Sequence, residues 1–180
     1  MTLKFVEVLL LGDEIIKMSK KKNLLVVEPH SDDSCFGAGA YLDFMKSKYD
    51  LYFQLVTASS VKLHHKYVSR EERIYEYSQY VKSLEGKLVK SKSRNNEFIL
   101  PIDKDSRLDT ISQADLVSAI ENAIYEIRPD QLLIMGPSFH HDHTIVYEAV
   151  KAATRPTFKF TVKKILLMES PTYIHSWNEE

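Results

Sequence analysis

Short apolar runs alternate with longer amphipathic segments through most of the chain, and this order constrains the fold more than any other feature. The first run, NLLVVEP at 23–29, has the length and the β-branched residues of a fully buried parallel strand. The same pattern predicts strands at 50–59, 97–102, 131–137 and 163–170, and helices at 37–49, 69–86, 112–129 and 142–156. We therefore expect an α/β sandwich with a mostly parallel sheet of about five strands and right-handed crossovers.

Length and composition predict one globular domain. The chain has 180 residues, of which 44% are hydrophobic, and this is enough for a sizeable core. A basic run, KMSKKK at 17–22, precedes the first strand and is typical of a solvated segment. We therefore expect residues 1–22 to form a short N-terminal extension and residues 23–180 to form a single domain.

Charge, cysteine content and hydropathy argue against several classes of protein. The formal net charge is −1, whereas a protein that binds nucleic acid usually has a basic excess. The single cysteine, Cys35, excludes an intrachain disulfide and favours a reducing, cytoplasmic location. No apolar run approaches the ~20 residues that span a membrane. We therefore expect no nucleic-acid partner and no membrane span.

Two of the predicted strands end in dense polar clusters. The first strand is followed by His30, Asp32 and Asp33, and the strand at 131–137 is followed by HHDH at 140–143. Open α/β sheets bind ligands at the carboxyl ends of their strands, and catalytic zinc takes three protein ligands while leaving one position for water. His30, Asp33 and one histidine of HHDH would make such a set.

A metal ion would also explain why two carboxylates are adjacent. The side chains of Asp32 and Asp33 diverge, so one can bind the ion while the other faces the water as a general base. Two neighbouring carboxylates are costly unless a cation offsets their charge. The alternative for each cluster is structural: HSDD would be a helix N-cap with a stray histidine, and HHDH would be a solvated loop.

Together, the two clusters resemble the motifs of a known family. PHSDD and HHDH are similar to P/A-H-x-D-D and H-x-D-H of the PIG-L/LmbE-like deacetylases. Members of that family are Rossmann-like zinc enzymes that remove acetyl groups from N-acetylglucosamine-type conjugates. The resemblance implies a Rossmann-like three-layer sandwich whose metal ligands are His30, Asp33 and His143.

The same resemblance implies catalytic and substrate-binding roles. Asp32 would be the base that activates water, a protonated His140 would stabilise the oxyanion or act as the acid, and Asp142 would orient His140. The helix RIYEYSQYVKSLEG resembles the family's R-x-x-E helix, which implies that Arg73 lies near the substrate. The alternative for Arg73 is an ordinary helix pair with Glu76.

The chain also departs from the family pattern. Ser34 stands where the family often has Glu after the second Asp. Family members generally continue beyond the last predicted strand, so residues 23–180 are expected to be a C-terminally short version of the domain. The metal is expected to be zinc because of the resemblance, with iron(II) as the alternative, since two histidines and one carboxylate also suit non-haem iron.

The expected function is metal-dependent removal of an N-acetyl group from an amino sugar or sugar conjugate. The expected partner is therefore a small N-acetylated sugar or sugar conjugate. Two alternatives stay open at this point: an amidase that acts on another acyl-amine conjugate, and a non-catalytic sugar-binding module. Formation of a homo-oligomer is also left open.

Overall fold

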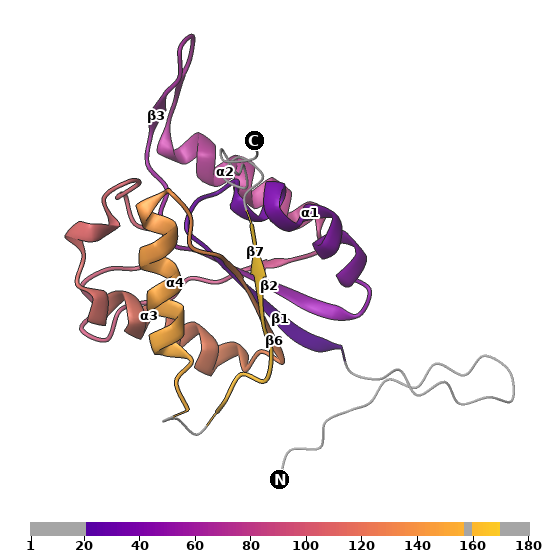
Figure 1. The fold of residues 1–180 in the computed structure, drawn as a ribbon. Helices are drawn as coiled ribbons and strands as arrows, with labels where there is room; N and C mark the ends of the chain where they lie inside the picture. Colours follow the sequence, from indigo (N-terminus) through magenta and orange to yellow (C-terminus); the bar gives the residue numbers. More distant parts are fainter. Residues whose placement is uncertain (1–20, 157–159, 170–180) are drawn as a thin grey trace, which may run out of the picture.

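The computed structural model describes residues 21–156 and 160–169. In these residues, five strands form one parallel sheet in the order β5-β2-β1-β6-β7, and helices cover both of its faces (Figure 1). The elements are, in chain order, β1 (Lys22–Glu28), α1 (Asp33–Met45), β2 (Tyr49–Leu55), β3 (Val61–Lys62), β4 (Tyr67–Val68), α2 (Arg70–Ser83), β5 (Lys87–Leu88), the 3-10 helix η1 (Leu108–Thr110), α3 (Gln113–Ile127), β6 (Gln131–Met135), α4 (His141–Ala153) and β7 (Ile165–Met168). The predicted α/β sandwich is confirmed.

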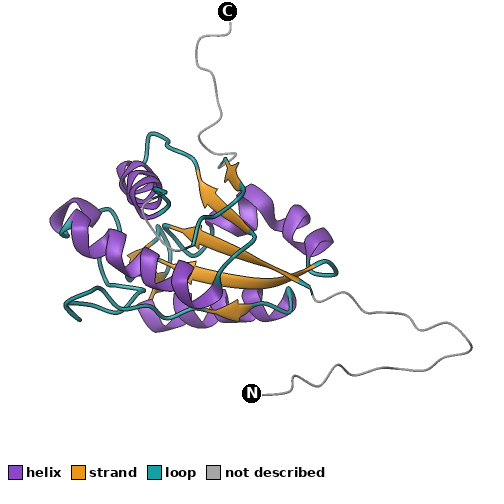
Figure 2. Ribbon diagram, turned by 90° about the horizontal axis from the view of Figure 1, so that it is seen from below, coloured by secondary structure: helices purple, strands orange, loops and turns teal. Residues whose placement is uncertain are grey.

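The central strand, β1, explains the two-sided cover. It pairs in parallel with β2 on one side and with β6 on the other, and its side chains from Leu24 onward are buried. Alternate residues enter two separate cores: Leu25 and Val27 pack with residues of α3 and α4, whereas Leu24 and Val26 pack with residues of α1 and α2. Figure 2 shows the helices lying on either side of the strands.

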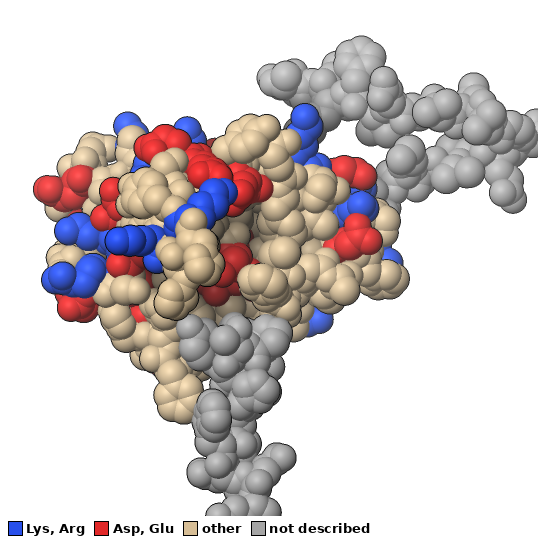
Figure 3. All heavy atoms as spheres, turned by 90° about the horizontal axis from the view of Figure 1, so that it is seen from above, with Lys and Arg blue, Asp and Glu red and all other residues tan. Residues whose placement is uncertain are grey.

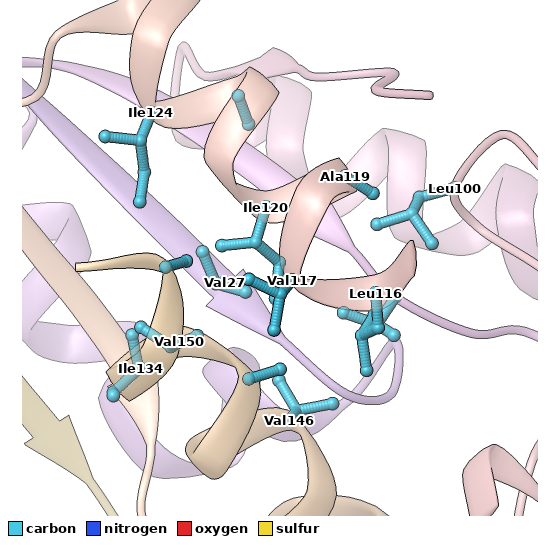
Figure 4. Packing of buried hydrophobic residues seen from close by; sticks show 14 of the residues in the cluster. Val27, Leu100, Leu116, Val117, Ala119, Ile120, Ile124, Ile134, Val146 and Val150 are labelled. Carbon is cyan, nitrogen blue, oxygen red and sulfur yellow. The ribbon is translucent and has the colours of Figure 1, made fainter. Parts of the chain in front are cut away.

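The core beneath α3 and α4 is built from branched aliphatic side chains. Ile120 of α3 and Val146 and Val150 of α4 lie around Val27 of β1 (Figure 4). Because Ile120 and Val150 are fully buried, both helices are held against the sheet by apolar surface removed from water.

Serine caps set the starts of two helices. Ser69 precedes α2 and accepts a hydrogen bond from the Glu72 N–H, and Ser112 precedes α3 and accepts one from the Asp115 N–H. The first helix differs from the prediction, because α1 begins at Asp33 rather than at residue 37. The second aspartate of HSDD therefore lies in the first turn of a helix, where a negative charge is favourable.

The predicted strand at 97–102 is wrong. This segment makes only isolated bridges, between Ile102 and Thr57 and between Ile99 and Lys92. Pro101 has no N–H to donate to a neighbouring strand, and this limits the segment to isolated bridges. The edge of the sheet is instead the two-residue strand β5, and the hairpin of β3 and β4 was also not predicted, because elements this short leave no periodic signal.

Two expectations from the sequence concern the ends of the chain and membranes. The predicted N-terminal extension at 1–22 lies outside the described residues, apart from Lys21 and Lys22, and Lys22 already belongs to β1. No helix within the described ranges is long and apolar enough to cross a membrane. The cytoplasmic location stays a prediction.

Candidate metal and catalytic site

The candidate site lies where the strand order reverses. From β1 the chain moves to β2 on one side, whereas β6 lies on the other side of β1. Strands arranged in this way leave a crevice at their carboxyl ends, where α/β proteins bind ligands. The loop after β1 leads to Asp33 at the start of α1, and the loop after β6 leads to His141 at the start of α4. Both polar clusters therefore meet at one edge of the sheet.

Three histidine side chains gather at this edge. One ring nitrogen each of His30, His140 and His143 lie within 4.8 Å of one another. The ring centroids are 4.6 Å apart for His30 and His140, 5.3 Å for His30 and His143, and 5.1 Å for His140 and His143. Imidazole nitrogens grouped this closely suit a divalent metal ion.

Asp33 lies between two of these histidines. Its Oδ2 is 3.5 Å from His30 Nδ1, and its Oδ1 is 3.3 Å from His143 Nε2. Two ligands that are each about 2.1 Å from one tetrahedral ion are about 3.4 Å apart, so both distances suit shared coordination. The structure thus brings His30, Asp33 and His143 together, and it adds His140 as a further candidate ligand.

His140 lies beside these three residues with one ring nitrogen unpaired. Its Nδ1 is buried and has no hydrogen-bond partner among the described residues, and its Nε2 lies 3.4 Å from Ser106 Oγ. A buried nitrogen left unpaired costs about 1–3 kcal/mol, which a ligand bound in the site would offset. The unpaired nitrogen and the spacing of His30, Asp33 and His143 therefore fit a site that holds a metal ion and a further ligand.

Asp142 is fully buried and contacts His30 rather than His140. Its Oδ2 lies 3.1 Å from His30 Nε2 and accepts the Ser106 N–H at 2.6 Å, while its Oδ1 accepts the Leu108 N–H at 3.2 Å. The structure differs here from the prediction that Asp142 orients His140, because these backbone groups fix the carboxylate beside His30. A carboxylate on Nε2 leaves Nδ1 of His30 for a metal.

Burial and neighbouring charges set the protonation of the cluster. Burial lowers the pKa of His30, but its bonds to Asp142 and Asp33 outweigh burial and raise the pKa to about 9. Burial raises the pKa of Asp33, but bonds to His143 and His30 hold it well below its usual range. Burial and the charge of His30 lower the pKa of His140. This last direction opposes the protonated state predicted for His140.

Asp32 occupies the N-cap position of α1 without acting as a cap. The residue is exposed, and its side chain makes no capping hydrogen bond. The structural alternative for HSDD therefore does not account for this carboxylate. Figure 3 looks onto the carboxyl ends of the strands and shows acidic atoms in a recess near the middle of this face.

Arg73 reaches the edge of the site from α2. Its guanidinium forms an ion pair with Asp105, donates to the Ser59 carbonyl at 2.8 Å, and lies 3.4 Å from Ser31 Oγ in the HSDD segment. Asp105 is itself held by the Thr57 hydroxyl at 2.9 Å. The described contacts of Arg73 are therefore with loops at the site, which does not match the alternative of a simple helix pair.

A buried carboxyl group that the sequence reasoning did not assign supports the first cluster. Glu28 ends β1 and is fully buried, its Oε2 accepts the Ser34 N–H at 2.8 Å, and its Oε1 accepts the Tyr77 hydroxyl. Burial raises the pKa of Glu28 to about 7. These bonds tie β1, α1 and α2 together around HSDD. The signal in the sequence was a lone acidic residue at the end of an apolar run.

Two serines beside the second cluster were also not predicted. Ser138 Oγ lies 2.8 Å from His143 Nδ1 and accepts the His140 N–H at 3.1 Å. Ser106, which contacts both His140 and Asp142, has a φ of 59°. Non-glycine residues are uncommon in this left-handed region and are often found at functional sites.

Comparison with solved structures shows the same fold in proteins of low sequence identity. The conserved protein TT1542 from Thermus thermophilus is 20% identical with a TM-score of 0.61, and the alignment covers 83% of this chain and 67% of that one. The A40926 pseudoaglycone deacetylase Dbv21 is 19% identical with a TM-score of 0.54, over 76% and 60% of the two chains. The N,N'-diacetylchitobiose deacetylase from Pyrococcus horikoshii is 18% identical with a TM-score of 0.53, over 76% and 52%.

This chain thus spans about half to two thirds of the length of these proteins, as the percentages show. No curated protein matched it. The comparison with protein families gives a match over residues 25–154, which is well over half of the chain and includes both polar clusters. On this match, and with the fold and the histidine-rich edge described above, the chain belongs to the PIG-L family, described as GlcNAc-PI de-N-acetylase.

Proposed function

We propose that this chain is a metal-dependent hydrolase that removes an N-acetyl group from an amino sugar or a sugar conjugate. The observation that carries the proposal is the convergence of His30, His140 and His143 with the Asp33 carboxylate at the carboxyl ends of β1 and β6. Membership of the PIG-L family, together with structural neighbours that include deacetylases, supports this class of reaction.

We assign the metal to His30 Nδ1, the Asp33 carboxylate and His143 Nε2, with zinc preferred and iron(II) as the alternative. A bound ion would supply Lewis-acid chemistry, which polarises the acetyl carbonyl and lowers the pKa of a water molecule. Asp142 holds His30 through Nε2, and Ser138 holds His143 through Nδ1, so each ring presents its other nitrogen to the site.

Asp32 is the general base in this proposal. It removes the proton from water as the water oxygen bonds to the acetyl carbon. Its carboxylate is exposed and makes no capping hydrogen bond to α1, which supports that role. His140 stabilises the oxyanion, and a neutral imidazole can do this by donating its one N–H. The carbon–nitrogen bond then breaks, with a proton delivered from Asp32 or His140, and acetate and the free amine leave.

Arg73 is the proposed substrate-binding residue. Its guanidinium lies beside Ser31 in the HSDD segment and is held by Asp105, so the side chain is oriented before a substrate arrives. A pre-oriented guanidinium suits hydrogen bonding to hydroxyl or phosphate oxygens of a sugar conjugate.

The first experiment is elemental analysis of the purified chain beside Asp33→Asn, with Asp109→Asn as the matched control. Asp109 is an exposed aspartate in the neighbouring 3-10 helix η1 and is not among the proposed ligands. About one metal ion per chain is expected in the wild type and the control, and little in Asp33→Asn. Acetate release from N,N'-diacetylchitobiose and from N-acetylglucosaminyl phosphatidylinositol would then be measured. A wild type that binds no added zinc or iron(II) would overturn the proposal.

A further inference from the structure

The strand β7 forms one edge of the sheet. Among the described residues it pairs only with β6, and Figure 1 shows it, in gold, between α4 and α1. The carbonyls of Lys164 and Met168 accept hydrogen bonds from the Leu132 and Gly136 N–H groups, each at 2.9 Å. Backbone groups of successive strand residues point to opposite sides, so Ile165 and Leu167 direct theirs away from β6.

The same two residues also carry exposed apolar side chains. Ile165 is 42% exposed and Leu167 is 54% exposed, whereas Met168 is buried. Because Ile165 and Leu167 are two residues apart, their side chains lie on one face of the strand. An apolar edge strand with unpaired backbone groups is a template for another strand.

The sequence around β7 can pair with a second, antiparallel copy of itself. The segment reads KKILLME over 163–169, and its charged ends have opposite signs. When two copies are placed antiparallel with Leu166 opposite Leu166, Ile165 faces Leu167 of the other copy. In the same register Lys163 faces Glu169, and both are exposed.

Backbone geometry is compatible with this register, and the charge pairing distinguishes it from registers shifted by two residues. In an antiparallel pair, residues that exchange two hydrogen bonds alternate with residues that exchange none. Leu166 lies between Ile165 and Leu167, so its backbone groups point toward β6 and it falls at a non-bonded pair. Ile165 and Leu167 then fall at the bonded pairs, where N–H and C=O groups that have no partner among the described residues meet.

We propose that the partner of this edge is a second copy of the chain. The two β7 strands pair antiparallel about a two-fold axis at Leu166 and join the two sheets into one. The interface is isologous, because every contact made by one copy is repeated by the other. It buries Ile165 and Leu167 against each other and places Lys163 beside Glu169 at both ends.

Sedimentation of the full chain tests this proposal. The wild type is expected to have twice the 20.8 kDa mass of one chain, and Leu167→Lys is expected to be monomeric at the same concentration. The matched control is Leu88→Lys, which places the same change at 43% exposure on β5, the opposite edge of the sheet, and leaves the dimer intact. A monomeric wild type, or a dimer that survives Leu167→Lys, overturns the proposal.

Two further tests, a charge exchange and a cross-link, examine the register rather than the edge alone. Lys163→Glu places like charges opposite each other and is expected to weaken the dimer, whereas Lys163→Glu combined with Glu169→Lys restores the pairing. Leu166→Cys in a Cys35→Ser background is expected to form an intermolecular disulfide, because the Cα atoms of a non-bonded antiparallel pair are about 4.5 Å apart. Failure of both the charge exchange and the cross-link would refute this register, and with it the dimer as described.

Discussion

The buried carboxyl group of Glu28 allows a prediction with a defined sign and size. In the folded chain, burial raises its pKa from 4.5 to about 7, so folding favours the protonated form. Its contribution to stability is therefore fully present below pH 4.5 and is lost as the pH rises through about 7. With 1.36 kcal/mol for each pKa unit, the loss is on the order of 3 kcal/mol.

Replacing Glu28 by Gln removes this charge while keeping the shape of the side chain. The amide oxygen can still accept the Ser34 N–H, and the amide NH2 can donate to the Tyr77 hydroxyl oxygen. Glu28→Gln is therefore expected to match the wild type at pH 4.5 and to be more stable by about 1–3 kcal/mol at pH 8.

The assay is urea unfolding of both proteins at the two pH values, with Glu97→Gln as a control. Glu97 is exposed, so its replacement should leave the difference between the two pH values unchanged. Other groups titrate in this range, but they do so in both proteins and cancel in the comparison. If Glu28→Gln were less stable than the wild type at pH 8, the argument from burial would be refuted.

Three other predictions concern the site and the core. Asp32→Asn should retain its metal yet lose at least about 100-fold in kcat, as expected for a general base, and turnover near the wild-type rate would exclude that role. Asp142→Asn should weaken metal affinity about 10- to 100-fold in a competition titration, because His30 loses a charged partner, whereas equal affinities would show that Asp142 does not act through His30. Ile120→Ala should lower the free energy of unfolding by about 2–5 kcal/mol in urea, because the side chain is fully buried, and a loss below about 1 kcal/mol would contradict the packing shown.

The sequence predicted the sheet and the two polar clusters because both depend on local patterns. The β-branched run of β1 and the apolar run of β6 mark buried strands, and polar residues that follow a strand lie at its carboxyl end. That β1 and β6 are neighbours depends on strand order, which no local pattern shows. The two clusters were combined because ligands bind at the carboxyl ends of parallel strands, and the resemblance to a known family supported this combination.

The contacts of the site were less predictable than its residues. Asp142 contacts His30 because its carboxylate is held in place by the N–H groups of Ser106 and Leu108, which are distant from it in the sequence. The role of Glu28 as an anchor for Ser34 depends on α2 covering the same point with Tyr77. Such contacts between distant segments leave no periodic signal in the sequence.

The loop at 105–108 joins the two halves of the site. Asp105 forms an ion pair with Arg73 on the proposed substrate side, and the Ser106 and Leu108 N–H groups bind Asp142 on the proposed metal side. An insertion or deletion within these four positions would disturb both sides at once. As the family diverges, we therefore expect changes of loop length to be tolerated elsewhere, such as in the hairpin of β3 and β4, while this short stretch keeps its length.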